Sequence, residues 1–453
     1  MVFRKLFGAS TPAPSPAAAD SPASDAESQS PASEDAGQDA DFEDAERFGD
    51  AEEMDRPDWG ARAAAVLPTG ASTGSKRPSA LHGEGGEGPL HFVRASGCHV
   101  TDTDGQTFVD CTMALGAVAL GYAEKRVLAA AVDAASRGNV AALSPVEEVE
   151  VAERLCDLVP CAEQVLFMKT GAEAVSAAVR LARTYTGRDV VIASGYFGWH
   201  DWASDAEGVP AAVRGDVVRI PFDDIPALEA AVARAGARLA AIVLEPVVER
   251  MPSAAWVQRA RACCDAAGSI LIVDEIKTGF RLRPAGYQEL SGITPDLATF
   301  GKAMSNGFPL SAVLGQRDVM QAMRRTWISS TLASDSVALA AAGAVLDWHV
   351  EADVCATLAE TGAEIRSRVD AAREASRCSG VRIAGEDPMW LMKWDDPADE
   401  SLFISAALHA GALFKRGAYN YAAIAHDAAA IDVIERAASE GFIAVRDSAA
   451  RRG

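Results

Sequence analysis

The chain has 453 residues, of which 49% are hydrophobic and 23% are charged, a length that suggests two or three domains with a substantial core. The net charge is −22, and residues 1–58 carry half of it, with fifteen acidic and four basic side chains. Neither part has the basic surface needed to neutralise a phosphate backbone, which argues against a nucleic-acid partner.

Membrane and secretory segments are not indicated. No apolar run reaches the ~18 residues needed to span a bilayer. The basic residues near the start lead into Ala, Pro and Ser instead of an apolar signal segment. The eight cysteines form no C-x-x-C pair and are too sparse for a disulfide framework. These features predict a cytoplasmic protein with buried free thiols.

Residues 1–56 are predicted to form a disordered acidic tail. From residue 9 onward this segment is rich in Ala, Ser, Pro, Asp and Glu, with almost no branched apolar residues. Such a composition cannot bury enough surface to offset the entropy of ordering. The simplest interpretation is a solvating tail. The alternative is that residues 3–7, Phe-Arg-Lys-Leu-Phe, dock the chain to a partner on a long tether.

From about residue 61 the sequence becomes globular, with short β-rich runs alternating with helical stretches. This alternation predicts a mainly parallel sheet covered by helices on both faces. A long helical region at 337–375 is followed by a smaller unit of mixed strands and helices. The predicted strands are 92–93, 107–110, 165–169, 190–193, 238–244, 270–273, 297–300 and 311–314, and the other predicted helices are 144–158, 172–185, 256–267, 403–412 and 428–440.

Three short segments that follow predicted strands carry the candidate chemistry. The first is Lys-Thr-Gly-Ala-Glu-Ala at residues 169–174, where a strand ends, Gly171 turns the chain and a helix begins. The free N–H groups and the dipole at a helix N-terminus suit a phosphate, so Thr170, Gly171 and Ala172 form a candidate phosphate site. Many strand–helix turns contain glycine, so this segment alone identifies no ligand.

The second segment is Ile-Leu-Ile-Val-Asp-Glu at residues 270–275. Its apolar residues deliver Asp274 and Glu275 to the C-terminal edge of the sheet, where α/β proteins bind ligands. A buried carboxylate needs a charged or strongly donating partner. A protonated pyridine nitrogen is such a partner and would make the ring an electron sink. A metal ion and a structural ion pair are the alternatives.

The third segment, residues 296–309, places Lys302 in a glycine-containing turn directly after a strand. Burial disfavours a charged amine, lowers its pKa and makes it a nucleophile towards an aldehyde. The rival is a nucleotide-binding P-loop, which needs glycine five residues before Gly301 and Ser or Thr after the lysine. This chain has Asp296 and Ala303 at those positions, which excludes the P-loop.

Together and in this order, the segments resemble the class III, fold type I pyridoxal-phosphate aminotransferases, and within them the glutamate-1-semialdehyde aminomutase-like branch. Residues 273–281, Val-Asp-Glu-Ile-Lys-Thr-Gly-Phe-Arg, are similar to the family's D-E-V-x-T-G-F-R stretch, and residues 295–302 to its P-D-x-x-x-x-G-K stretch. The resemblance covers about residues 67–443. It implies an α/β large domain (106–345) with a mostly parallel sheet of the seven-stranded type. A smaller α+β domain (346–453) would be joined by an N-terminal segment (57–105).

The resemblance also implies roles around the ring of pyridoxal 5'-phosphate. Lys302 would hold the cofactor as a Schiff base and then carry the proton, and Asp274 would pair with the pyridine nitrogen. Ile276 would pack on one ring face and Tyr196 on the other. Glu245 matches the glutamate of a family E-P pair near the cofactor.

Further implied contacts reach the phosphate. Gly171 and Ala172 would present backbone amides to it. Thr331, in Ser-Ser-Thr-Leu at residues 329–332, matches a threonine that reaches the phosphate of the neighbouring subunit. This match implies a homodimer with shared active sites.

The chain departs from the family pattern in two places. Phe197 stands where the family usually has histidine after the stacking tyrosine, and we expect it to remain a cofactor contact. The family's T-F-G-G becomes Thr-Leu-Ala-Ser at residues 331–334. Candidate substrate contacts are aromatic or basic and comprise Trp199 and His200, in a loop after a strand, and the arginines Arg250 and Arg416. The histidines show no metal-ligand spacing.

The expected function is a pyridoxal-phosphate-dependent aminotransferase that acts on a small-molecule amino donor and a carbonyl acceptor through Lys302. The same constellation could support an intramolecular amine transfer, like that of glutamate-1-semialdehyde 2,1-aminomutase, or a racemisation. A different class of function is that of a cofactor-binding protein recruited to an assembly by its N-terminal tail.

Overall fold

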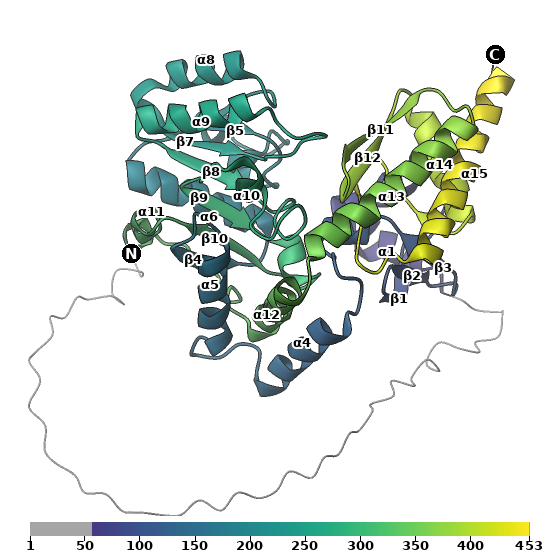
Figure 1. Cartoon of the computed structure of the whole chain (residues 1–453), viewed down its shortest axis with the longest axis horizontal. Coiled ribbons are helices and arrows are strands. Elements are labelled where there is room, and N and C mark those ends of the chain that lie inside the picture. Colours follow the sequence, from purple (N-terminus) through teal and green to yellow (C-terminus); the bar gives the residue numbers. More distant parts are fainter. Residues whose placement is uncertain (1–56, 453) are drawn as a thin grey trace, which may run out of the picture. The chain divides into compact units, whose positions relative to one another are not determined.

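The computed structural model describes residues 57–452. The predicted tail, residues 1–56, and the docking hypothesis for residues 3–7 lie outside this range. Within it, a seven-stranded sheet has the order β4-β10-β9-β8-β7-β5-β6 (Figure 1). Its strands are β4 (Gln164–Met168), β5 (Val190–Ser194), β6 (Val217–Arg219), β7 (Leu239–Leu244), β8 (Ile270–Asp274), β9 (Leu297–Phe300) and β10 (Ser311–Gly315).

The sheet confirms the predicted mostly parallel architecture. Strands β6, β5, β7, β8 and β9 pair in parallel, whereas β10 runs antiparallel to both of its neighbours, β9 and β4. Strands covered on both faces read as continuous apolar runs because neither face meets water. This burial explains why runs such as Ile-Leu-Ile-Val at residues 270–273 were recognisable in the sequence.

Helices cover the two faces of the sheet. Along β5, Val191 and Ala193 pack with α6 (Gly171–Thr186), whereas Val190 and Ile192 belong to the core under α8 (Ile225–Ala235) and α9 (Ala254–Ala267). Figure 1 shows α8 and α9 together beside β7. This alternation follows from the two-residue period of a strand.

A third core lies between the sheet and the helices α4 (Lys125–Arg137), α5 (Val146–Leu158) and α12 (Ser336–Glu351). The sequence did not predict α4. The predicted helical region at 337–375 is two helices, because Ala352 adopts an extended conformation after α12. Asp353 then caps α13 (Val354–Ala375) by accepting a hydrogen bond from the Ala356 amide.

The C-terminal part packs α13, α14 (Pro397–His409) and α15 (Ala428–Arg452) against the sheet formed by β11 (Val381–Glu386), β12 (Met389–Trp394) and β14 (Asn420–Tyr421). The predicted helix at 403–412 begins earlier and ends at His409. Gly411, with φ of 99°, turns the chain, and Ala412 then enters a strand.

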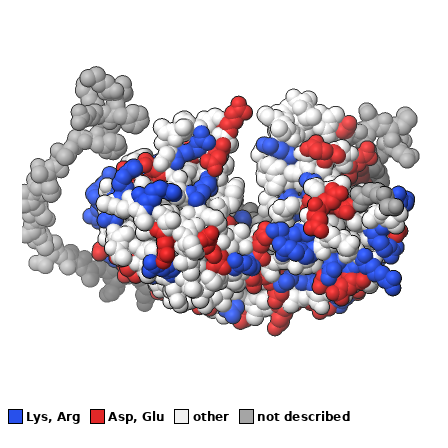
Figure 2. All heavy atoms as spheres, turned by 90° about the horizontal axis from the view of Figure 1, so that it is seen from above, with Lys and Arg blue, Asp and Glu red and all other residues white. Residues whose placement is uncertain are grey.

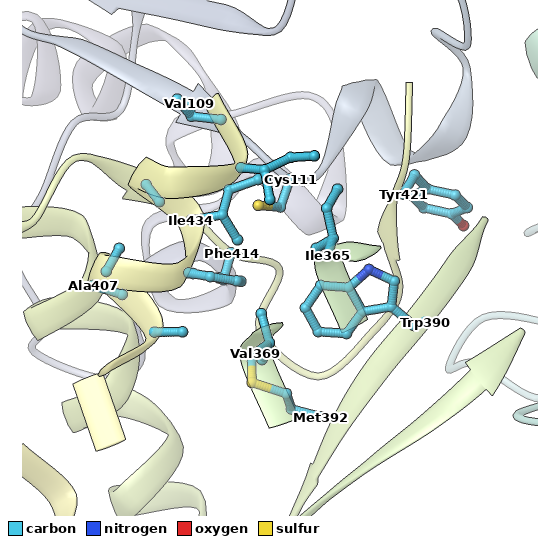
Figure 3. Packing of buried hydrophobic residues seen from close by; sticks show 14 of the residues in the cluster. Val109, Cys111, Ile365, Val369, Trp390, Met392, Ala407, Phe414, Tyr421 and Ile434 are labelled. Carbon is cyan, nitrogen blue, oxygen red and sulfur yellow. The ribbon is translucent and has the colours of Figure 1, made fainter. Parts of the chain in front are cut away.

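A second small sheet joins the N-terminal segment to this part. It comprises β1 (Phe92–Ser96), β2 (His99–Asp102), β3 (Thr107–Asp110) and β13 (Ala412–Leu413), and β13 runs parallel to β3. Figure 3 shows Val109 and Cys111 in the same core as Ile434 and Phe414. The short helices are α1 (Trp59–Val66), α2 (Pro78–His82), α3 (Met113–Gly116), α7 (Ala211–Arg214), α10 (Tyr287–Ser291) and α11 (Arg317–Met320).

The surface charges are mixed in sign. On the face that Figure 2 shows, Lys and Arg side chains are interspersed with Asp and Glu. Among residues 57–452, no helix combines the length and the apolar character required to cross a bilayer.

Candidate active site

A cavity of about 380 Å³ lies where strands of the large sheet end. Most of the residues that line the cavity stand at or just after the C-terminal ends of β4, β5, β7, β8 and β9. This is the sheet edge at which α/β proteins bind ligands. The predicted residues that line it are Thr170, Gly171, Ala172, Tyr196, Phe197, Trp199, Glu245, Asp274, Ile276 and Lys302.

The turn before α6 has the features of an anion site. The Thr170 hydroxyl accepts a hydrogen bond from the Glu173 amide, and the Glu173 carboxylate accepts one from the Thr170 amide at 2.8 Å. This capping box occupies the Thr170 side chain, so an anion here would meet the next backbone N–H groups of the helix. A Cβ added to Gly171 would lie 3.2 Å from Ile276 Cγ2, so glycine allows Ile276 to pack against the turn.

Asp274 ends β8 and is 5% exposed. Its Oδ1 accepts hydrogen bonds from the Ile276 amide at 3.0 Å and from Thr299 Oγ1 at 2.9 Å. Burial and, to a smaller extent, the negative charge of Glu245 raise the pKa of Asp274 to about 7. Both recorded hydrogen bonds end on Oδ1, so a cationic N–H donor in the cavity could be accepted by Oδ2 and would favour the ionised carboxylate.

Lys302 follows β9 and is partly buried. Burial lowers the pKa of Lys302 to about 8, and the positive charge of Lys277 acts in the same direction. The residue has a φ of 49°, in the left-handed region that non-glycine residues rarely adopt. Asn306 fixes the loop after Lys302, because its side-chain oxygen accepts hydrogen bonds from the amides of Ala119 and Leu120.

The turn after β5 places two adjacent aromatic residues in different environments, one exposed and one buried. Tyr196 is 74% exposed, and its amide donates to Glu245 Oε2 at 3.0 Å. Phe197 is only 2% exposed and stacks on Trp202 with ring centroids 6.1 Å apart. A histidine at this buried apolar position would need a polar partner, which accounts for phenylalanine here.

The structure does not bring all predicted substrate residues to the cavity. Trp199 lines it and is 75% exposed, whereas His200 is hydrogen-bonded to Ser176. Arg250 forms an ion pair with Asp223 at 2.5 Å. Arg416 lies near Glu400, and Thr331 is exposed outside the cavity of its own chain.

Two lysines that the sequence did not single out also line the cavity. Lys277 Nζ lies 2.5 Å from Glu245 Oε1. Lys169 Nζ donates to the Pro309 carbonyl at 3.0 Å and pairs with Asp335. Lys277 occupies the variable position of the stretch at 273–281. Its position shortly after a buried strand was the one feature of the sequence that could have pointed to it.

Glu275 gives a pH-dependent prediction. It is fully buried, and burial raises its pKa to about 7 from the usual 4.5. The folded state then keeps a proton that the unfolded state releases, so this group's contribution is present below about pH 4.5 and is lost as the pH rises through 7. Between pH 4 and pH 8, we expect the free energy of unfolding to fall by on the order of 3 kcal/mol more in wild type than in Glu275→Gln.

Urea unfolding of both proteins across that pH range measures the difference. Glu289→Gln, at a half-exposed glutamate of α10, is the matched control and should follow wild type. Parallel pH dependence of wild type and Glu275→Gln would contradict the assigned protonation of Glu275.

The cavity fits pyridoxal phosphate. Lys302 offers an amine of lowered pKa for its aldehyde, Asp274 a carboxylate for its ring nitrogen, and the start of α6 a set of N–H groups for its phosphate. Among residues 57–452 no cluster of three or more His, Cys, Asp or Glu side chains could hold a metal ion.

Comparisons with known proteins agree with this geometry. The family Aminotransferase class-III matches residues 83–199 and 210–423. A relative named 2'-deamino-2'-hydroxyneamine transaminase, from Streptomyces kanamyceticus, is 37% identical over 76% of this chain and 87% of its own. Glutamate-1-semialdehyde 2,1-aminomutase of Myxococcus xanthus is 36% identical over 63% of this chain and 70% of its own.

Among solved structures, the pyridoxal-phosphate internal aldimine form of the Sphingopyxis sp. MTA144 FumI protein has a TM-score of 0.83 and 27% identity. It covers 87% of this chain and 97% of its own. The family match spans most of the chain, including every strand that delivers a residue to the cavity. The chain therefore belongs to the class III aminotransferases, and it is a pyridoxal-phosphate enzyme of fold type I.

Proposed function

We propose that the enzyme transfers an amino group between a small-molecule amino compound and a separate carbonyl acceptor, with Lys302 as the proton carrier. The observation that carries this proposal is that Lys302 and the buried Asp274 line one cavity at the edge of the sheet. Pyridoxal phosphate, when bound, supplies an aldehyde for the amine and a ring that withdraws electrons from the reacting carbon.

The chain's own residues divide the remaining work. Lys302 Nζ, with a pKa of about 8, can both accept and return a proton near neutral pH. Asp274 would keep a proton on the nitrogen of the cofactor ring. The N-terminus of α6 would hold the phosphate, and Tyr196 and Ile276, which also line the cavity, would restrict the ring, so that its orientation would be fixed before the proton moves.

Transfer to a second molecule is favoured over an intramolecular shift by the similarity to the Streptomyces kanamyceticus transaminase, which extends over 87% of that protein. We further propose a polyhydroxylated amine as the substrate class. The exposed indole of Trp199 at the cavity offers an apolar face, and neither candidate arginine reaches the cavity. The aminomutase relatives keep the intramolecular reaction as the second candidate.

An acceptor test separates these reactions. The enzyme is incubated with amino donors, with and without a keto acid, and products are identified by mass spectrometry. We expect turnover only when the acceptor is present. Isomerised product without any acceptor would establish the aminomutase reaction, and loss of chirality alone would establish a racemase.

We propose a homodimer in which Thr331 reaches the neighbouring phosphate. Thr331 is exposed and does not line the cavity of its own chain, and the adjacent Leu332 is 53% exposed. Leu143 and Val146 are also exposed, at 83% and 66%, and apolar side chains of this kind commonly mark an interface.

Thr331→Ala is therefore expected to weaken cofactor binding by about 10–100-fold, the loss of one hydrogen bond to a charged group. The dissociation constant is measured by fluorescence, and light scattering should show a dimer for both proteins. Ser329→Ala, at an exposed position two residues earlier, is the control. Unchanged affinity in Thr331→Ala, or a monomeric wild type, would contradict the shared site.

We propose a cytoplasmic location, which the eight free cysteines support. Docking through residues 3–7 stays a hypothesis. Comparing partners that co-purify with the full chain and with a chain lacking residues 1–56 tests it, with turnover measured in both.

A further inference from the structure

Lys277 is a second lysine inside the cofactor cavity, and it is firmly held. Its Nζ lies 2.5 Å from Glu245 Oε1, with side chains only 9% and 13% exposed. The same ammonium lies 4.2 Å from the ring centroid of Tyr419. The Tyr419 hydroxyl in turn accepts the Glu249 amide at 2.6 Å, which fixes the ring. Lys277 is therefore clamped between a carboxylate and an aromatic face.

This clamp keeps Lys277 charged. Burial alone would lower its pKa, but Glu245, Tyr419 and Tyr421 outweigh that effect, and the pKa of Lys277 is raised. Glu245 uses its other oxygen, Oε2, to accept the Tyr196 amide. The Lys277–Glu245 pair thus joins the turn after β8 to the end of β7, and Glu245 extends this connection to the turn after β5.

We propose that the ion pair of Lys277 and Glu245 controls how readily Lys302 Nζ gains and loses its proton. The two residues are positioning residues that act on Lys302 through their charges. This inference rests on the proposed role of Lys302 and adds the residues that tune it.

The charged groups that face Lys302 support this role. After burial, Lys277 is the largest cause that lowers the pKa of Lys302, and Arg281 acts in the same direction. Asp274 and Glu245 oppose them. Arg281 is fully buried and donates hydrogen bonds to backbone carbonyls, and Asp274 is assigned to the ring nitrogen. Lys277 and Glu245 are therefore the charged residues that can be substituted to change the charge near Lys302.

The sign of each substitution follows. Lys277→Met removes a repelling cation and leaves Glu245 unpaired, so both effects hold the proton on Lys302 more tightly. Glu245→Gln leaves Lys277 unbalanced and should loosen the proton. The double variant restores a locally neutral pair and should return towards wild type. Lys277→Arg keeps the charge and should also resemble wild type.

The experiment is a spectrophotometric pH titration of each holoenzyme. The visible band of the lysine–cofactor link reports the proton on Lys302 Nζ. We expect the midpoint to rise by about one to two pH units in Lys277→Met, since nearby charges shift buried groups by this amount. We expect it to fall in Glu245→Gln and to lie near wild type in the double variant.

Lys393→Met is the matched control, because Lys393 pairs with Glu249 at 2.5 Å and does not line the cavity. The proposal is overturned if Lys277→Met titrates like wild type or like Lys393→Met, or if Glu245→Gln shifts in the same direction as Lys277→Met. If one of these two variants does not fold, the direction of the shift in the other variant still tests the proposal. A wild type with no visible band of the lysine–cofactor link would instead refute the assigned role of Lys302, and a wild-type band that does not change with pH would overturn the proposed control by Lys277 and Glu245.

Discussion

Lys302→Ala is expected to abolish the covalent capture of the cofactor and to lower the turnover number by at least about 10⁴-fold. Both effects have one origin, because the same amine bonds to the aldehyde and carries the proton. Among the three lysines of the cavity, Lys302 is the one that follows β9, and its pKa is lowered to about 8 beside the carboxylate of Asp274 in the same cavity.

Reduction with borohydride, followed by peptide mass mapping, measures the capture directly. In wild type the reduced cofactor should be found on the peptide that contains Lys302. Lys393→Ala, which removes a lysine outside the cavity, should retain both trapping and activity. Trapped cofactor on Lys277 or Lys169, the other lysines of the cavity, would transfer the assignment to that residue.

Asp274→Asn should retain the fold and still bind the cofactor, but lose about 10²–10⁴-fold in turnover. Asparagine preserves the volume and an oxygen for the Ile276 amide and Thr299. It removes the charge that holds a proton on the ring nitrogen. Losing one partner of a buried ion pair costs about 3–5 kcal/mol, which corresponds to the expected range in rate.

The turnover number and the cofactor dissociation constant of Asp274→Asn are measured together. Asp296→Asn provides a control, since Asp296 is another nearly buried carboxylate of the sheet but pairs with Arg261 away from the cavity. A turnover number within about threefold of wild type would contradict the role of Asp274, because a lost ion pair of 3–5 kcal/mol predicts a far larger fall.

The parts of the site that the sequence predicted are those encoded locally. Asp274 follows an uninterrupted apolar run, and Lys302 follows a short, mainly apolar strand and Gly301. Buried strands of this kind deliver the residues that follow them to the edge of the sheet. The capping box of Thr170 and Glu173 is likewise contained in four consecutive residues.

Pairings between distant residues could not be predicted in this way. Arg250 was a candidate ligand, but it meets Asp223 on a neighbouring loop. Lys277 finds Glu245 and Tyr419 only because three separate segments converge. The pairing of β13 with β3 joins the two ends of the described chain, and no local pattern encodes such a contact.

The position of β10 has a consequence for how the enzyme is made. In the described part of the chain, β4 has a single neighbour in the large sheet, and that neighbour is β10. On the ribosome, β4 emerges long before β10, by roughly 7–30 seconds at ordinary rates of synthesis. During that interval Leu166 and Phe167 lack their strand partner.

The nascent chain should therefore expose an aggregation-prone edge until residue 315 has left the ribosome tunnel. The turn at Gly171 and the amine of Lys302 are brought together by the same late event, since β10 pairs with both β4 and β9. We therefore expect the cofactor to bind only after β10 has paired with β4 and β9. Slower translation upstream of β10 should lengthen the interval in which chaperones are needed.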